Sequence, residues 1–359
     1  MDEARKSSKA KAKRVGPLRA IRRAARGLWT RLLLRAAHWP LVPSLYYFLC
    51  DRSFDREHRA ALLGKLRHHT NAPAKTLPQH YTLRRNVHRI EKGLLMRPRR
   101  PVFAETYIKE TVTLFAQCAP AAPGLPLMEW ARDVLHEYFT ATDGAPEVAG
   151  YRAIFDQAVA ACCTAPPTQQ VPYARNLTPL RITYDDMLAL AQRRRSVRWY
   201  EQRPVPREII DRAVTVAGLA PSACNRQPFE FRIFDDRERV QEIAKIPMGT
   251  AGFSENFPCL VVLVGHMSAF EYERDRHLIY IDGSLASMSF QFALEVQGIA
   301  SCSINWPDFR RTERKMAKAL NLRPDERVVM LISLGYPDPQ GMVAYSRKKS
   351  LDELRSYNT

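Results

Sequence analysis

Two short segments of the chain carry residues that could bind an anion and a heterocyclic ring. The first, residues 193–198, reads Arg-Arg-Arg-Ser-Val-Arg, and its four guanidinium groups repel one another unless an anion lies among them. If this segment is helical, Arg194 and Arg198 share a face, with Arg195 and Ser196 beside them. That arrangement suits a phosphate group, and a solvated helix end is the alternative.

The second segment, residues 221–228, reads Pro-Ser-Ala-Cys-Asn-Arg-Gln-Pro and is a turn sequence rich in side-chain amides and hydroxyls. It lies between an expected helix, 207–219, and an expected strand, 229–234. A loop of this composition can form hydrogen bonds around a heterocycle. The candidate ligands in it are Ser222, Ala223, Asn225 and Gln227.

Hydrophobic periodicity predicts the elements that position these segments. Residues 258–264 form a continuous apolar run between Asn256 and Gly265, as a strand buried on both faces would. The expected strands are 229–234, 258–264, 299–304 and 327–334, and the expected helices are 184–195, 207–219, 236–246 and 274–297. The first of these helices begins at the N-terminal sequence Thr183-Tyr-Asp-Asp. These elements predict an α+β layer architecture.

The helix expected over 274–297 is apolar on almost every side. Between Tyr280 and Val296, apolar or small residues occupy nearly every face, so this helix should be buried. Small residues such as Gly283 and Ala286 would let another helix approach closely. Two arrangements stay open: a helix shared between two subunits, or the central helix of a monomer.

Several motifs together resemble the FMN-dependent nitroreductase family, which also contains iodotyrosine-deiodinase-like and flavin-cannibalising enzymes. The motifs are RRSVRWY at 194–200, PVPREII at 204–210 and APSACNRQPFEF at 220–231. The resemblance continues through GIASCSINWP at 298–307, GYPD at 335–338 and the basic RKK at 347–349, and so covers residues 184–359. It implies a nitroreductase-like FMN-binding fold, in which a mostly antiparallel central sheet is flanked by helices, and a homodimer built around the long helix.

The resemblance also assigns roles to individual residues. It implies that Arg194, Arg195, Ser196, Arg198, Arg347 and Lys348 bind the FMN phosphate, and that Ser222, Ala223, Asn225, Gln227, Ile304 and Asn305 contact the rest of the cofactor. Ser303 is the expected catalytic residue, a hydroxyl donor near N5 of the flavin. NAD(P)H would be a transient reductant, because the sequence contains no dinucleotide fingerprint. The deiodinase branch has Gly-Ala-His-Thr-Glu where residues 223–227 read Ala-Cys-Asn-Arg-Gln, which argues against a halotyrosine substrate.

The first forty residues form a strongly basic arm. They carry twelve Lys or Arg against Asp2 and Glu3 and supply +10 of the net charge of +18. From Pro17 apolar residues recur at helical spacing beside a basic face, which predicts an amphipathic helix over 17–37. This helix could make peripheral contact with an anionic membrane or pack on its own protein. Nucleic acid is not an expected partner, because no recognisable reading module follows.

Cysteine usage and hydrophobicity indicate the cellular compartment of the protein. Seven cysteines form no CxxC pair, which predicts neither a disulfide framework nor a metal site and favours the cytoplasm. No secretory h-region follows the basic start. The longest apolar run, 39–50, contains Pro40 and Pro43 and is shorter than the roughly 20 residues that cross a bilayer.

Composition divides the chain into four expected parts. They are a basic arm with an amphipathic helix (1–50), a mainly helical region (51–163), a proline-rich linker (164–180) and a nitroreductase-like FMN domain (181–359). Expected helices in the second part are 54–67, 103–118, 126–140 and 150–162.

Residues 84–94 of the helical part resemble an HRLEKGL segment of one nitroreductase-like subgroup, often encoded near polysaccharide-assembly enzymes. Within this segment His88 and Glu91 are one helical turn apart and could be an acid-base pair, metal ligands or a structural hydrogen bond.

The predicted function is an FMN-dependent oxidoreductase that reduces a small organic substrate with NAD(P)H by ping-pong hydride transfer. The alternative is an accessory flavin-binding protein in cell-surface polysaccharide assembly, without turnover of its own.

Overall fold

The computed structural model describes residues 35–70, 77–122, 124–162 and 168–358, with Ala25, Leu28, Trp29 and residues 31–33. It divides the chain into two compact units, one ending at His58 and the other beginning at Arg59. Residues 17–24 of the predicted amphipathic helix lie outside the described residues. In the part of that helix that is described, residues 31–33 are helical.

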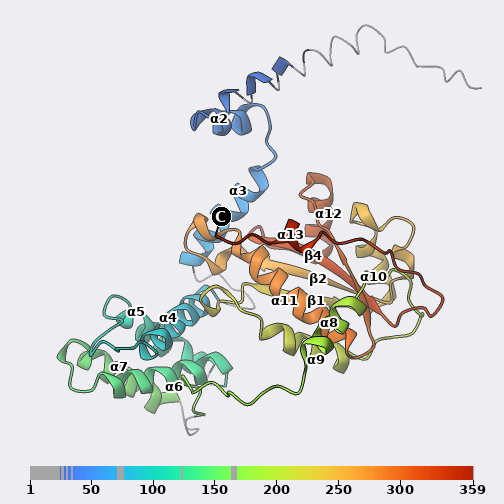
Figure 1. Ribbon diagram of the computed structural model, residues 1–359. Coiled ribbons are helices and arrows are strands. Elements are labelled where there is room, and N and C mark those ends of the chain that lie inside the picture. The colour runs from blue at the N-terminus through green and yellow to red at the C-terminus, as the bar shows by residue number, and fades with distance from the viewer. Residues whose placement is uncertain are drawn as a thin grey trace, which may run out of the picture. The chain divides into compact units, whose positions relative to one another are not determined.

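A four-stranded antiparallel sheet forms the centre of the second unit (Figure 1). The strands are β1 (Phe229–Phe234), β2 (Cys259–His266), β3 (Ala300–Ile304) and β4 (Glu326–Gly335), in the order β1-β2-β4-β3. Every neighbouring pair is antiparallel. The predicted α+β fold with an antiparallel central sheet is confirmed.

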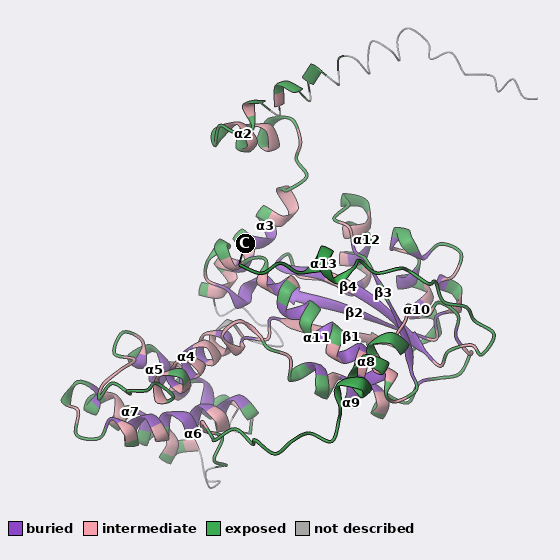
Figure 2. Cartoon of the chain, in the orientation of Figure 1, coloured by how far each residue is buried: buried purple, intermediate pink, exposed green. Residues whose placement is uncertain are grey.

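Strand β2 is buried along its whole length because helices cover both faces of the sheet (Figure 2). Cys259 and Val261 belong to one core, which they share with α9 (Arg207–Gly218) and α11 (Leu278–Glu295). The intervening Leu260 and Val262 belong to a second core with α10 (Arg237–Ala244) and α12 (Arg310–Leu320). The side chains alternate between the two faces as the period of two requires. The sequence reasoning did not include α12, in which only Met316 and Leu320 are buried.

Helix α11 buries half of its residues, nine of 18. Gly283 faces the sheet, since a Cβ there would lie 3.3 Å from Leu263 Cδ2, and Ala286 is buried in the core. These two small residues therefore allow close packing of α11 within its own protein. Ile281, Leu285 and Met288 are 36–48% exposed and form an apolar stripe along the opposite side.

Four further helices enclose a core of their own. They are α4 (Pro78–Leu94), α5 (Ile108–Cys118), α6 (Pro126–Ala141) and α7 (Pro146–Cys162). Val87, Phe115, Tyr138 and Phe155 each come from a different one of these helices and are buried together. Helix α5 begins five residues later than the expected 103, because residues 101–107 form turns.

Helices α3 (Asp55–His69) and α4 also pack against the sheet-bearing part of the second unit. Ala60 of α3 and Tyr81 of α4 share a buried cluster with Met267, Phe270 and Ile279. Polar contacts add to it, since His68 Nδ1 lies 2.9 Å from Ser268 O and Arg85 pairs with Glu271 at 3.4 Å. The helical region is therefore joined to α11 and to the segment that follows β2 by a shared buried cluster.

The expected linker contains no helix or strand over its described residues, 168–180. Its beginning is tied to α6, because Asp133 Oδ2 accepts hydrogen bonds from Thr168 N at 2.9 Å and Gln170 N at 3.0 Å. Beyond it the chain enters α8 (Tyr184–Arg193), which begins with the expected cap: Thr183 and Asp186 form a capping box.

Candidate functional site

The arginine motif is extended and not helical. Helix α8 ends at Arg193, and Ser196 forms a parallel bridge with Ser301 of β3. The helix expected over 184–195 therefore ends two residues early, and Arg194 and Arg198 do not share a helical face. In an extended segment alternate side chains point to the same side, so Arg194, Ser196 and Arg198 still converge.

These side chains line a small pocket of about 80 Å³. Its lining residues are Arg194, Arg195, Ser196, Arg198, Ala344, Ser346 and Lys348. Four of these seven described residues are cationic and none is acidic, so the pocket concentrates positive charge. An anion bound there would relieve the repulsion among the cations.

The C-terminal tail completes the pocket. Arg195 Nη2 donates to Ala344 O at 2.6 Å and also to Tyr345 O, which brings Lys348 to the arginine motif. A wider groove of about 830 Å³ adjoins the pocket and is lined by Arg347 as well as Lys348. The two basic residues of the tail are thus brought to the same region, and Arg347 lies on the outer groove.

The loop 221–228 is fastened to helix α11 through one carboxylate. Asp282 Oδ2 accepts a hydrogen bond from Ser222 Oγ at 2.7 Å and another from Ala223 N at 3.0 Å. Ser222 Oγ in turn accepts from Gln227 N at 2.8 Å. Gln227 Nε2 donates to Gly218 O at 2.7 Å, so this expected cofactor ligand also ties the loop to α9.

The backbone of this loop is strained. Cys224, Asn225 and Gln227 all have φ of 51°, in the left-handed region that residues with a Cβ rarely adopt. Each such residue costs on the order of 1 kcal/mol, so the loop keeps this conformation only where its surroundings hold it. Strain of this kind clusters at ligand-binding sites.

Arg226 anchors the loop on its other side. Its guanidinium lies over the ring of Phe270 at 5.1 Å, and the side chain is buried. Burial lowers the pKa of Arg226. Helix α4 contacts the turn at 223–225, so the helical region packs directly against the loop.

Ser303 lies near the end of β3, and its hydroxyl already has a partner. Ser303 Oγ donates to Gln291 Oε1 of α11 at 3.1 Å. Its side chain is exposed, whereas the neighbouring Ile304 is buried and Asn305 is exposed. To donate a hydrogen bond to a bound cofactor, the hydroxyl would have to rotate away from Gln291.

The predicted ligands fall into three groups: the arginine motif, the loop 221–228 and the end of β3 with Ser303. Helix α11 supports the second and the third of them. Asp282 holds the loop, and Gln291, nine residues later, holds Ser303. At 1.5 Å per residue these anchors are about 14 Å apart along the helix. The first group is linked to β3 by the bridge between Ser196 and Ser301.

Sequence reasoning missed Asp282, Gln291 and Asn256, whose Nδ2 donates to Arg198 O at 2.8 Å. One signal could have indicated the first of them. Asp282 is the single acidic residue between Tyr280 and Leu294, and an acid in an otherwise apolar helix is either buried with a partner or functional.

The His88–Glu91 pair is part of a hydrogen-bonded contact between α4 and α6. His88 Nδ1 lies 3.4 Å from Glu91 Oε2, and Glu91 Oε1 accepts from Trp130 Nε1 at 3.0 Å. Both oxygens of the Glu91 carboxylate therefore have partners. The guanidinium of Arg84 lies over the ring of Trp130, 6.0 Å from its centre.

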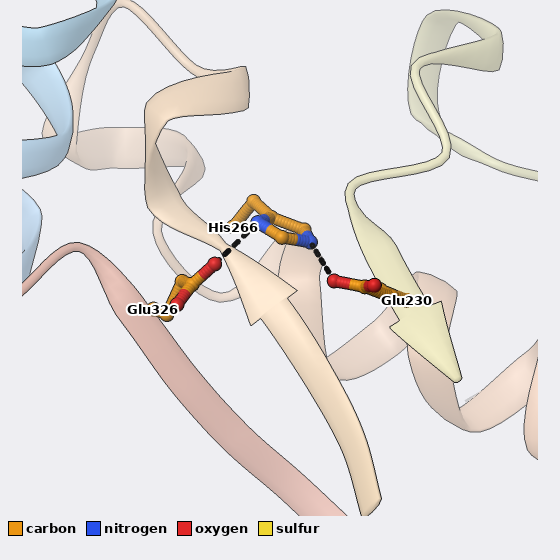
Figure 3. A group of neighbouring side chains, drawn as sticks. All are labelled: Glu230, His266 and Glu326. Carbon is orange, nitrogen blue, oxygen red and sulfur yellow. Dashed lines mark ion pairs between the residues drawn. The ribbon is translucent and has the colours of Figure 1, made fainter. Parts of the chain in front are cut away.

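A second polar cluster lies where β1, β2 and β4 meet. Figure 3 shows His266 between Glu326, 3.5 Å from Nδ1, and Glu230, 3.8 Å from Nε2. One histidine and two carboxylates within reach of one another could hold a metal ion.

Guanidinium groups already neutralise these carboxylates. Arg232 Nη2 lies 3.0 Å and Arg323 Nη1 2.9 Å from Glu326 Oε1, and Arg232 Nε lies 3.3 Å from Glu230 Oε2. A divalent cation would face two fixed positive charges at close range. We interpret the cluster as a buried ion network that stabilises the sheet.

Comparison with known proteins agrees with the motifs. Residues 191–252 and 247–336 match the family model described as "Nitroreductase family".

Residues 191–336 form a nitroreductase-family domain.

Individual relatives match about half of the chain. Iodotyrosine deiodinase 1 of Pongo abelii is 24% identical over 193 residues, which cover 46% of this chain and 66% of that protein. A protein of Archaeoglobus fulgidus described as an NADH dehydrogenase/NAD(P)H nitroreductase is 29% identical over 155 residues, covering 43% of this chain and 86% of its own. The solved structure of an FMN-dependent nitroreductase from Clostridium difficile has a TM-score of 0.42 at 24% identity, and the match covers 48% of this chain and 99% of that one. The nitroreductase-family domain contains all of the predicted site residues except the two from the tail.

The ion network predicts a pH dependence of stability. Burial lowers the pKa of His266 below its usual 6.5, against the opposing effect of Glu326, and Arg323 lowers it further. Below pH 6.5 the unfolded chain therefore binds a proton that the folded protein does not. We expect thermal stability to fall as the pH drops below 6.5, by up to about 1.4 kcal/mol per pH unit from this residue.

His266→Gln should flatten this part of the curve of melting temperature against pH, even if it lowers stability at neutral pH. His277→Gln, at an exposed histidine, is the control. An unchanged slope in the His266 variant would contradict the assignment.

Proposed function

We propose that the protein is an FMN-dependent oxidoreductase that reduces a small organic substrate with NAD(P)H. The observation that supports this most directly is the convergence of Arg194, Arg195, Arg198 and Lys348 on one pocket that no acidic residue lines among those described. Such a pocket suits the phosphate of a mononucleotide, because charge-assisted contacts to phosphate oxygens are the strong hydrogen bonds of proteins.

The residues present fit the cofactor. Arg194, Arg195, Ser196, Arg198 and Lys348 would hold the phosphate, and Arg347 would lie at the outer edge. Ser222, Ala223, Asn225 and Gln227 would border the ring and the ribityl chain, together with Ile304 and Asn305. When bound, FMN would supply the redox chemistry, by accepting a hydride and passing electrons on.

The protein's own part is to bind and orient. Asp282 presents the loop 221–228 in one conformation, and Gln291 orients the Ser303 hydroxyl. Ser303 is the proposed donor near the redox-active edge of the cofactor, after it rotates from Gln291. No general base among the site residues is required by this scheme.

The reductant and the substrate would use the same pocket in turn. The sequence has no separate dinucleotide-binding fingerprint, so NAD(P)H would approach the cofactor directly and leave before the second substrate enters. Both nitroreductases and iodotyrosine deiodinases are among the relatives. The loop sequence Ala-Cys-Asn-Arg-Gln at 223–227 favours a substrate other than a halotyrosine.

The proposed assembly is a homodimer in the cytoplasm. In support, Ile281, Leu285 and Met288 expose an apolar stripe on α11, and Val216 on the adjacent α9 is 44% exposed. A second copy related by a two-fold axis would cover this surface.

The phosphate site is tested by removing two of its cations. Arg194→Ala with Arg198→Ala should weaken FMN binding by at least about 100-fold, because each charge-assisted contact contributes roughly 1.5–3 kcal/mol. FMN retained after desalting is read from its visible absorbance. Arg310→Ala with Arg311→Ala, at exposed positions on α12, removes the same charge elsewhere. A wild-type protein that cannot be reconstituted with FMN would overturn the proposal.

The support of the loop is tested at Asp282. Asp282→Asn keeps the size of the side chain but removes the charge that accepts from Ser222 and Ala223, so FMN affinity should fall roughly 10- to 100-fold. Circular dichroism of the bound cofactor should also change, because the strained loop relaxes. Asp211→Asn, at an exposed site on α9, is the matched control. Unchanged affinity and spectrum in the Asp282 variant would refute this role.

The dimer is tested on the exposed stripe. Leu285→Glu with Met288→Glu would place two carboxylates in the proposed interface and should give monomers, since burying unpaired charge costs several kcal/mol. Light scattering gives the mass of each species. Ile154→Glu, at an exposed position of α7, should leave the mass unchanged. A monomeric wild-type protein would contradict the homodimer.

A further inference from the structure

Helix α2 (Leu41–Leu49) has an apolar face that no described residue of its own unit covers. Leu41, Leu45, Phe48 and Leu49 recur at i, i+4, i+7 and i+8, which places them on one side of the helix. They are 54–75% exposed, and no residue of α2 is buried. Figure 2 accordingly shows α2 without any buried residue.

The other side of α2 already has partners. The rings of Tyr46 and Tyr47 are 5.2 Å apart, and Tyr47 meets Phe54 edge-on at 4.5 Å. Through these ring contacts Phe54 packs against the side of the helix that carries Tyr47. The apolar face points away from this contact.

The charge next to this face is strongly positive. Residues 1–40 carry a net charge of +10, and Arg31 and Arg35 among them are exposed. Trp39, which directly precedes the helix, is 73% exposed. Basic residues attract anionic headgroups, and tryptophan favours the boundary between headgroups and acyl chains.

We propose that α2 is a membrane-surface anchor whose apolar face inserts into an anionic lipid bilayer while the basic arm pairs with the headgroups. Nine residues of helix span only about 14 Å, so α2 would lie in the plane of the interface. Within the described part of the chain, no helix is long and apolar enough to cross a membrane. The apolar face of α2 and the basic arm together provide the two signals that stable peripheral attachment requires.

This anchor differs from the amphipathic helix expected over 17–37, because its apolar contacts come from residues beyond that range. It is also independent of any flavin chemistry. The two contributions predict different behaviour in salt: added salt screens the charges but leaves the apolar insertion in place.

The test is sedimentation of the full-length protein with vesicles of phosphatidylcholine alone and of equimolar phosphatidylcholine and phosphatidylglycerol. The wild type should bind the anionic vesicles and retain a fraction of that binding at high salt. Phe48→Ser with Leu49→Ser should lower the partition coefficient by at least about tenfold and abolish the salt-resistant fraction. Arg31→Gln with Arg35→Gln should weaken binding at low salt only.

Leu62→Ser with Leu66→Ser, two exposed leucines one turn apart on α3, is the matched control and should bind as the wild type does. The proposal is overturned if the wild type ignores anionic vesicles, or if the Phe48 and Leu49 variant binds them undiminished. It is equally overturned if that variant changes only the molecular mass in light scattering, since the face would then be a contact between proteins.

Discussion

The carboxylate of Asp282 is the interaction on which the candidate site depends. It is buried within an apolar helix, where an unpaired charge would be very unfavourable, and it is compensated by hydrogen bonds from Ser222 Oγ and Ala223 N. In return these bonds hold a loop with three residues in the left-handed region. The loop and the helix therefore stabilise each other through this carboxylate.

The helical region takes part in the same arrangement. Helix α4 buries Val87 and Ile90 in the core of the four helices, while Tyr81, nearer its beginning, packs with Phe270 in the cluster beside the loop. Phe270 also carries the guanidinium of Arg226. The segment containing HRIEKGL thus connects the helical core to the site, which explains why both belong to one compact unit.

Two polar clusters differ in charge balance, and therefore one stabilises the fold while the other is suited to bind an anion. In the network of Glu230, His266 and Glu326, the carboxylates are matched by Arg232 and Arg323, so the charges are satisfied within the protein. In the arginine pocket no described lining residue offsets the cations. Only the second cluster gains from an external anion, and this imbalance is the physical basis of the proposed cofactor site.

Local patterns were sufficient to predict much of the chain. The apolar run at 258–264 indicated β2, the sequence Thr183-Tyr-Asp-Asp indicated the start of α8, and β1 was predicted at its observed bounds. These features depend on neighbouring residues: burial on both faces requires a continuous apolar run, and a cap requires a side chain next to the first free N–H groups. The positive charge of residues 193–198 was equally evident from composition.

Tertiary structure alone decided how these parts combine. The arginine motif is extended because Ser196 pairs with β3, a contact across more than 100 residues that no local pattern contains. The hydrogen bonds from Ser303 to Gln291 and from Ser222 to Asp282 likewise join residues of different elements, so no local pattern predicts them. On α11 the sequence determined that nearly every face is apolar, but only packing decided that Ala286 faces the core and that Leu285 stays exposed. Periodicity specifies which residues share a side of an element, whereas the partner of each side depends on contacts between distant segments.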